Sequence, residues 1–122
     1  MPVQMKRAYE ELSNEDGVRV LVDGIWPRGV SKEELKIDHW LKGLAPSKEL
    51  RQWFDHDADK FVEFKTKYKE ELRSDDEKEK ELEKLKEIVS KNKKDVTLVY
   101  GAKDDKHNQA TVLKEIVDQQ RV

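Results

Sequence analysis

Apolar positions along the chain gather in two short continuous runs and in several stripes at helical spacing. The two runs cover residues 18–23 and 95–100 and are rich in β-branched side chains. Short apolar runs bounded by polar, glycine-containing segments predict buried strands. Residues 3–9 have weaker β character, and residues 13–17 have the composition of a turn.

Most of the chain between and after these runs has the apolar spacing of amphipathic helices. Phe61, Phe64, Tyr68 and Leu72 recur at intervals of 3, 4 and 4 residues and predict a long helix capped by Asp57. A second helix, at about residues 74–91, and a third, at about 107–119, are predicted from two further apolar sets: Leu82, Leu85, Ile88 and Val89, then Ala110, Leu113, Ile116 and Val117. The charged positions of residues 77–81 predict a solvated helix face.

Three shorter helices are expected before the long one. Ser31, with Glu34 three residues on, predicts a capping box. In residues 36–44 the apolar intervals are 3, 1 and 3, which predicts a helical face with His39 on its surface. Ser47 follows Ala45 and Pro46 and is expected to cap a helix that contains Leu50, Trp53 and Phe54.

The order of strand, helices, strand and helix predicts an α/β fold with a small, mostly parallel sheet flanked by helices. More than 70 residues separate the two apolar runs, so parallel pairing through a helical crossover is expected. With 122 residues, the chain is expected to form one compact domain over residues 1–122.

Composition excludes several classes of site. There is no cysteine, so disulfides, thiol catalysis and cysteine-ligated metal are excluded. The net charge of −2 does not favour nucleic acid as a partner. No apolar run has the roughly 20 residues that a membrane span needs, and no signal peptide is recognised. We therefore expect a cytoplasmic protein without a membrane partner.

Two polar loops, residues 23–29 and 101–108, leave the predicted carboxyl ends of the two apolar strands. Ligands of open parallel sheets bind at that edge, so both loops are expected to face one crevice. Arg28 offers a planar fork for a carboxylate or phosphate, and Lys103 adds charge. His107 and Asn108 begin a helix whose free amides favour an anion. The pattern predicts an anion-binding pocket with an aromatic wall from Trp26 or Tyr100.

Each candidate has a simpler structural interpretation. Asp23, His56 and His107 are candidates for proton transfer, although turns and helix caps also explain them. Arg51 could reach the crevice or pack its stem over Trp53. Asp104 could serve a ligand or a solvated loop. Because no H-x-x-x-H or H-E-x-x-H spacing occurs, no metal is expected.

Several separated motifs resemble those of the YeaO-like family, also called domain of unknown function 488. They occur in the family's order over nearly the whole chain. They are Val20-Leu21-Val22-Asp23, Trp26-Pro27-Arg28-Gly29, Ala45-Pro46-Ser47, Leu50-Arg51, Trp53-Phe54, His56-Asp57, and Ala102-Lys103-Asp104 followed by His107-Asn108.

The resemblance implies a compact bacterial α/β protein without an established activity or cofactor. Family motifs place a set of residues among the candidate site positions: Trp26, Pro27, Arg28, Gly29, Arg51, His56, Lys103, Asp104, His107 and Asn108. The family commonly has an arginine after the aspartate of the first motif, and this chain has Gly24 there. If that arginine binds a ligand elsewhere in the family, affinity or specificity differs here.

Three functions follow as hypotheses. The first is a protein that binds a small anionic ligand near Arg28, Lys103 and His107, either as an enzyme of unknown reaction or without catalysis. The second is a non-catalytic interaction module, which predicts an exposed apolar patch. The third is weak nucleic-acid binding. The sequence leaves the ligand, the reaction and the oligomeric state open.

Overall fold

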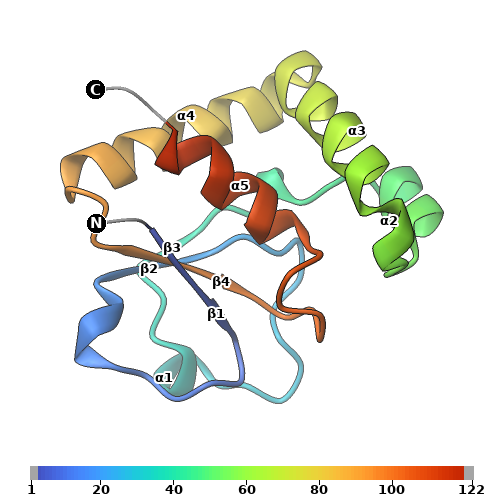
Figure 1. Ribbon diagram of the computed structural model, residues 1–122. Helices are drawn as coiled ribbons and strands as arrows, with labels where there is room; N and C mark the ends of the chain where they lie inside the picture. The colour runs from blue at the N-terminus through green and yellow to red at the C-terminus, as the bar shows by residue number, and fades with distance from the viewer. Residues whose placement is uncertain (1–2, 120–122) are drawn as a thin grey trace.

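Four parallel strands form one sheet in the order β1-β4-β2-β3 in the computed structural model, which describes residues 3–119 (Figure 1). They are β1 (Gln4–Arg7), β2 (Val18–Leu21), β3 (His39–Trp40) and β4 (Val96–Tyr100). The two apolar runs are the central pair, with Val20 opposite Leu98 and neither side chain exposed. Their parallel pairing confirms the predicted α/β fold class.

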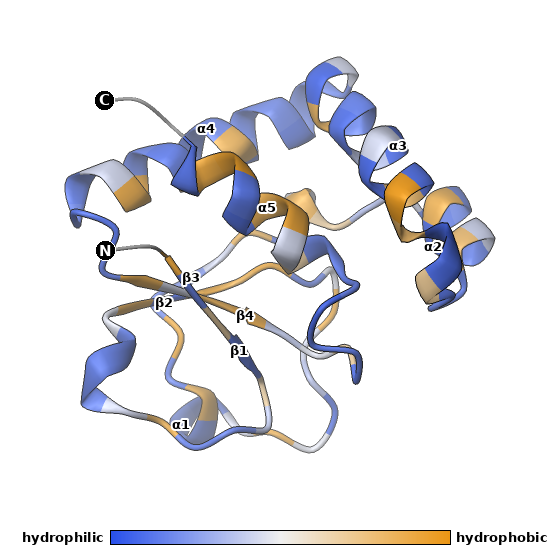
Figure 2. Ribbon diagram, viewed as in Figure 1, coloured by the Kyte–Doolittle hydropathy of each residue, from blue (hydrophilic) through white to orange (hydrophobic). Residues whose placement is uncertain are grey.

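The helices cover the two faces of the sheet unequally. α3 (Phe61–Ser74), α4 (Asp76–Lys91) and α5 (Gln109–Asp118) lie on one side of it, with α2 (Lys48–Phe54) at their edge, whereas α1 (Lys32–Leu35) lies on the other (Figure 1). Figure 2 shows the central strands mostly in hydrophobic colours and α4 largely in hydrophilic ones. The main core therefore lies between the sheet and the large helices.

The predicted helical stripes and caps are confirmed. Phe61, Phe64, Tyr68 and Leu72 are all buried on α3. Asp57 caps a short 3₁₀ turn, Ala58–Lys60, that leads directly into this helix. Ser31, with its capping box, and Ser47 cap α1 and α2 as predicted. Asp75 caps α4.

The helix predicted for residues 36–44 is wrong. His39 and Trp40 form β3 at the edge of the sheet, and Lys42–Leu44 form a 3₁₀ turn. His39 is exposed, but on a strand. Leu41 and Leu44 are buried as a helical face would require, since a strand followed by a tight turn produces the same apolar spacing.

A smaller apolar cluster covers the other face of the sheet and fixes the loop after β2. Its buried members are Ala8, Leu21, Leu35 and Val99. Trp26 packs against this cluster and meets Trp40 edge to face, with ring centroids 5.5 Å apart. The indole Nε1 of Trp26 also donates to the carbonyl of Val30 at 2.6 Å, which closes the loop.

No helix within residues 3–119 has both the length and the apolar character needed to cross a membrane.

Candidate functional site

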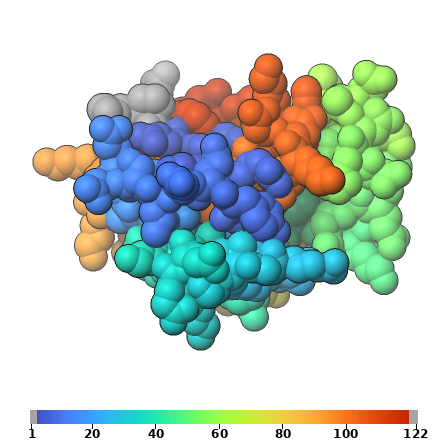
Figure 3. Space-filling view, turned by 90° about the horizontal axis from the view of Figure 1, so that it is seen from below, coloured from blue at the N-terminus to red at the C-terminus, as the bar shows by residue number. Residues whose placement is uncertain are grey.

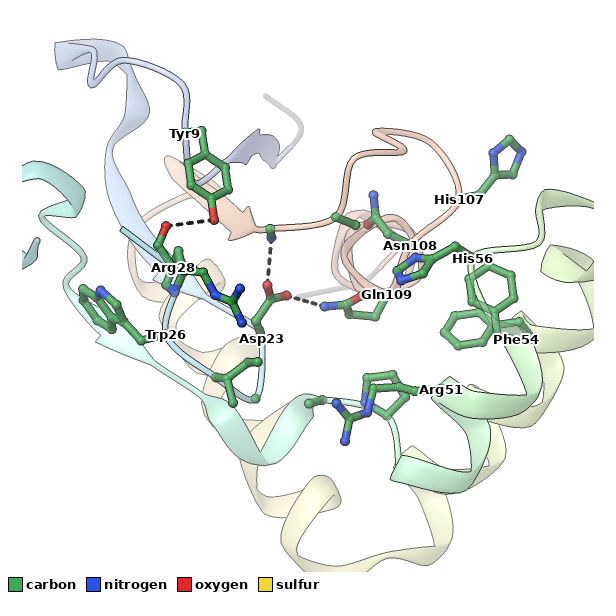
Figure 4. A pocket seen from close by; sticks show the side chains of 18 residues that line it. Tyr9, Asp23, Trp26, Arg28, Arg51, Phe54, His56, His107, Asn108 and Gln109 are labelled. Carbon is green, nitrogen blue, oxygen red and sulfur yellow. Dashed lines mark hydrogen bonds between the residues drawn. The ribbon is translucent and has the colours of Figure 1, made fainter. Parts of the chain in front are cut away.

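A pocket of about 600 Å³ opens where β2 and β4 end. The loop after β2, the loop after β4 and the α2 segment all contribute to it (Figure 4). Figure 3 shows the loop after β4, in orange, next to the green helical region at one end of the molecule. The lining residues are Tyr9, Asp23, Gly24, Ile25, Trp26, Pro27, Arg28, Ala45, Pro46, Arg51, Phe54, His56, Phe64, Gly101, Ala102, His107, Asn108 and Gln109.

Asp23 links the loop after β2 to the loop after β4, to the start of α5 and to β3. Its Oδ2 accepts from the backbone N–H of Gly101 at 2.8 Å, and its Oδ1 accepts from Nε2 of Gln109. Its backbone carbonyl accepts from Nε1 of Trp40 at 2.8 Å. Burial raises the pKa of the Asp23 carboxyl, and the two hydrogen bonds to its oxygens only partly offset that effect.

The loop after β4 is built around the start of α5. Asn108 caps this helix: its side-chain oxygen accepts from the N–H of Thr111 at 3.1 Å, and its amide donates to the carbonyl of Asp104 at 2.8 Å. Asn108 is buried, and these two hydrogen bonds satisfy its side-chain amide there. The start of α5 is thereby held at the wall of the pocket, where its amide dipoles favour negative charge.

Arg28 and Arg51 supply positive charge to the pocket from two sides. Arg28 lies on the loop after β2, where its carbonyl accepts from the hydroxyl of Tyr9 at 3.2 Å. Arg51 lies on α2. Both side chains are exposed, and neither guanidinium has a carboxylate partner among the residues that the structure describes. Both therefore keep their donors available to a ligand.

His56 points its ring into the pocket from the end of α2 (Figure 4). Two successive residues, Asp55 at φ 46° and His56 at φ 55°, adopt the left-handed conformation. Asp55 ends the helix there, its N–H donating to the carbonyl of Arg51 at 2.9 Å. Left-handed backbone is costly for residues other than glycine. This path of the chain turns the imidazole back toward the cavity.

His107 lines the pocket, but its ring points away from the cavity (Figure 4). The ring meets Phe61 edge to face at 5.2 Å, and its Nδ1 lies 2.9 Å from Oδ2 of Asp104. The N–H groups of Lys106 and His107, together with this imidazole, lower the pKa of Asp104 to about 2. Asp104 thus stabilises the loop rather than facing the pocket.

Phe54, Phe64 and Trp26 line the pocket, whereas Tyr100 does not. Phe54 and Phe64 stack with centroids 4.4 Å apart. Tyr100 is 2% exposed and does not line the pocket. Trp26 lines it, but its indole points away from the cavity (Figure 4) and meets the ring of Trp40 edge to face. The Tyr100 alternative is wrong, because this buried ring does not line the pocket, whereas Trp26 does.

Seven of the nine residues proposed from the sequence line the pocket: Asp23, Trp26, Arg28, Arg51, His56, His107 and Asn108. Lys103 and Asp104 do not, and Lys103 is exposed. Tyr9 and Gln109 were missed. Gln109 is the first residue of the helix that Asn108 caps, so the predicted helix start also indicates Gln109 as a site residue. No local sequence signal indicates Tyr9.

Gly24, where the family commonly has an arginine, also lines the pocket. A Cβ added there would lie 3.1 Å from Cβ of Ala45, tighter than ordinary van der Waals contact. A side chain at this position therefore requires Ala45 to shift, and Gly24 leaves that part of the cavity open.

Within residues 3–119, no group of three or more histidine, aspartate or glutamate side chains is arranged to hold a metal ion.

Comparison with known proteins gives matches over most of the chain. The model of a family described as the inactive DUF488-N3 subclade matches residues 2–121. An uncharacterized protein of Escherichia coli K12, YeaO, is 38% identical over 94% of this chain and 96% of its own length. Uncharacterized proteins of Mycobacterium tuberculosis H37Rv and Mycobacterium bovis are each 49% identical over 70 residues, 57% of this chain. These matches span 59% of the mycobacterial relatives' own length. No solved structure matches.

Proposed function

Because the chain belongs to the YeaO-like family, domain of unknown function 488, and to its subclade described as inactive, we propose that its pocket binds a small anionic ligand without transforming it. The observation that carries this proposal is the pair of unpaired guanidinium groups, Arg28 and Arg51, on two sides of one cavity. Arginine forks bind carboxylate and phosphate groups in a planar, bidentate manner.

The start of α5 supports the same ligand class. Asn108 satisfies the amide of Thr111, the third residue of the helix, and both Asn108 and Gln109 at the helix start line the pocket. The free amides at the helix start and the two arginines act on the same charge, so a phosphate or carboxylate would gain from both.

The size and the apolar wall of the pocket indicate a ligand larger than a bare ion. A volume of about 600 Å³ is in the range of small-molecule sites. Phe54, Phe64, Pro46 and Ala45 supply apolar surface beside the charged groups. The expected ligand therefore has a carbon skeleton that contacts these side chains and an acidic group that reaches the arginines.

Binding is favoured over catalysis because neither candidate histidine is both oriented by a second group and directed into the cavity. A catalytic histidine is commonly oriented by a second group. His56 faces the cavity without a hydrogen-bond partner among residues 3–119, whereas His107 is oriented by Asp104 but turned away. This arrangement agrees with the description of the subclade as inactive.

The two alternative functions have less support. Among the described residues, the exposed large hydrophobic side chains are Tyr9, Leu12, Ile25 and Val62. Tyr9 and Ile25 already line the pocket, which agrees better with a ligand than with a separate apolar docking patch. The near-neutral net charge of −2 gives no field for nucleic acid. The relatives are bacterial, and we propose a bacterial cytoplasmic location.

Thermal unfolding in the presence of inorganic phosphate, nucleotides and small carboxylates tests this proposal. We expect at least one of these anions to raise the melting temperature of the unaltered protein, and Arg28→Ala and Arg51→Ala each to reduce that rise. Lys103→Ala is the matched control, since it removes a cation outside the pocket lining. Failure of every anion to raise the melting temperature would contradict the proposal.

A further inference from the structure

Charges of both signs line this one pocket without pairing with each other. Arg28 and Arg51 extend toward the same cavity that the Asp23 carboxyl borders (Figure 4). Among residues 3–119, no ion pair within 4.0 Å joins Asp23 to either arginine or to any other cationic side chain. Opposite charges that share a cavity and stay apart leave room for a molecule that contacts both.

The Asp23 carboxyl has no positively charged partner among residues 3–119. Its two oxygens accept from neutral donors only, the N–H of Gly101 and the amide of Gln109. Each oxygen has a second lone pair, and an ionised carboxylate in a partly desolvated site is stabilised by a cationic partner. The chain supplies no such partner in the region that the structure describes, so a ligand can supply it.

The two arginines, in turn, have no negatively charged partner among the described residues. A ligand with acidic groups alone would satisfy them but would bring negative charge next to Asp23. A ligand with cationic groups alone would pair with Asp23 but would be repelled by the arginines. Only a molecule that carries both kinds of group meets every charged side chain with its opposite.

We propose that the ligand of this pocket is a small zwitterion, whose positively charged nitrogen pairs with Asp23 and whose acidic group binds Arg28 and Arg51. This inference rests on the proposed anion site and narrows its ligand class. Asp23 is then a specificity-determining residue, since it distinguishes an amino acid or aminoalkyl phosphate from the corresponding simple acid. Gln109 positions the carboxyl for that contact.

Calorimetric titration with matched probes tests the inference. O-phosphoethanolamine and ethyl phosphate differ at the ammonium group, as do β-alanine and propionate. A charge-assisted hydrogen bond in a partly desolvated site corresponds to roughly a tenfold or greater preference, so we expect each zwitterion to bind about tenfold tighter than its partner. Ethanolamine alone is expected to bind more weakly than O-phosphoethanolamine.

Asp23→Asn identifies the group responsible. This variant is expected to reduce the preference to about twofold or less and to leave the affinity for ethyl phosphate equal or higher, because a nearby negative charge is removed. Asp105→Asn is the matched control: it removes an exposed carboxylate on the loop after β4, outside the lining, and should keep the preference.

The outcomes separate the two proposals. Equal binding of the zwitterion and the simple acid to the unaltered protein would overturn the zwitterion inference and leave the anion site standing. Absence of binding by all four acidic probes would contradict both. If Asp23→Asn fails to fold, the comparison of probes on the unaltered protein still decides the question.

Discussion

The carboxyl of Asp23 and the backbone N–H of Gly101 join the ends of the two central strands through a 2.8 Å hydrogen bond. The two residues are 78 positions apart in the sequence. Because β2 and β4 run parallel, both strands end at the same edge of the sheet, and this bond fixes the spacing of the loops that follow them. The pocket lies directly at this junction.

This junction predicts a pH dependence of stability. Burial raises the pKa of folded Asp23 above the ordinary value of 3.8. At pH values between 3.8 and the folded pKa, the folded protein therefore keeps a proton on Asp23 that the unfolded chain has released. The contribution of Asp23 to the free energy of unfolding is therefore fully present below the ordinary value and is lost as pH rises through the folded pKa.

Asp23→Asn cannot titrate at this position and isolates the effect. The stability of the unaltered protein relative to Asp23→Asn should decrease as pH rises above the ordinary pKa of 3.8, measured by urea unfolding at each pH. A difference that stays constant or grows in favour of the unaltered protein would show that burial of this carboxyl does not control its ionisation.

Asp104 predicts the opposite dependence. Its folded pKa, lowered to about 2 by the N–H groups of Lys106 and His107 and by the imidazole, lies below the ordinary 3.8. Its contribution is present above the ordinary value and is lost as pH falls toward about 2. Asp104→Asn should therefore be less stable than the unaltered protein at neutral pH, and this difference in unfolding free energy should disappear in acid. Amide exchange of His107 measured against pH checks this.

Gly17 predicts a large cost for a single added methyl group. It precedes β2 at φ 65° and ψ −140°, a conformation that other residues avoid, and a Cβ there would lie 2.3 Å from the carbonyl oxygen of Asp95. Gly17→Ala should lose roughly 2–5 kcal/mol of unfolding free energy. Gly29→Ala is the control: its φ of 79° is also left-handed, but a Cβ meets nothing within 4 Å. Equal losses in the two variants would refute the steric part of this argument.

Ser47 predicts a link between helix capping and ligand binding. Its hydroxyl oxygen accepts from the N–H of Leu50 at 3.1 Å, and its O–H donates to Oε2 of Glu71 at 2.6 Å. These bonds hold the start of α2 against α3. Ser47→Ala should cost roughly 1–2 kcal/mol in chemical unfolding and should also weaken anion binding, because α2 carries Arg51. Ser74→Ala removes an exposed hydroxyl bond at the end of α3 and should change neither quantity measurably.

The elements that depend on local chemistry could be predicted from the sequence. The caps at Ser31, Ser47 and Asp57 and the apolar stripe of α3 follow from short-range patterns. The parallel pairing of the two apolar runs follows from the long helical segment between them. β3 could not be predicted, because its two residues owe their conformation to the neighbouring β2 and not to their own sequence.

The site could be predicted only at the level of its loops. The position of both loops at one edge follows from parallel strands, but the direction of each side chain depends on contacts that the sequence does not display. The Trp26 indole packs against Trp40, and the His107 ring contacts Phe61 and Asp104. His56 enters the cavity because two left-handed residues, Asp55 and His56, follow α2.

Mapping of phosphate binding by amide chemical-shift changes tests the central claim most directly. We predict that inorganic phosphate shifts the backbone amides of Gly24, Arg28, Arg51 and Gln109 in a saturable manner, and that these changes disappear together in the Arg28→Ala, Arg51→Ala double variant. Saturable changes confined to other parts of the chain, such as the lysines of α4, or no changes at high phosphate concentration, would contradict an anion site where β2 and β4 end.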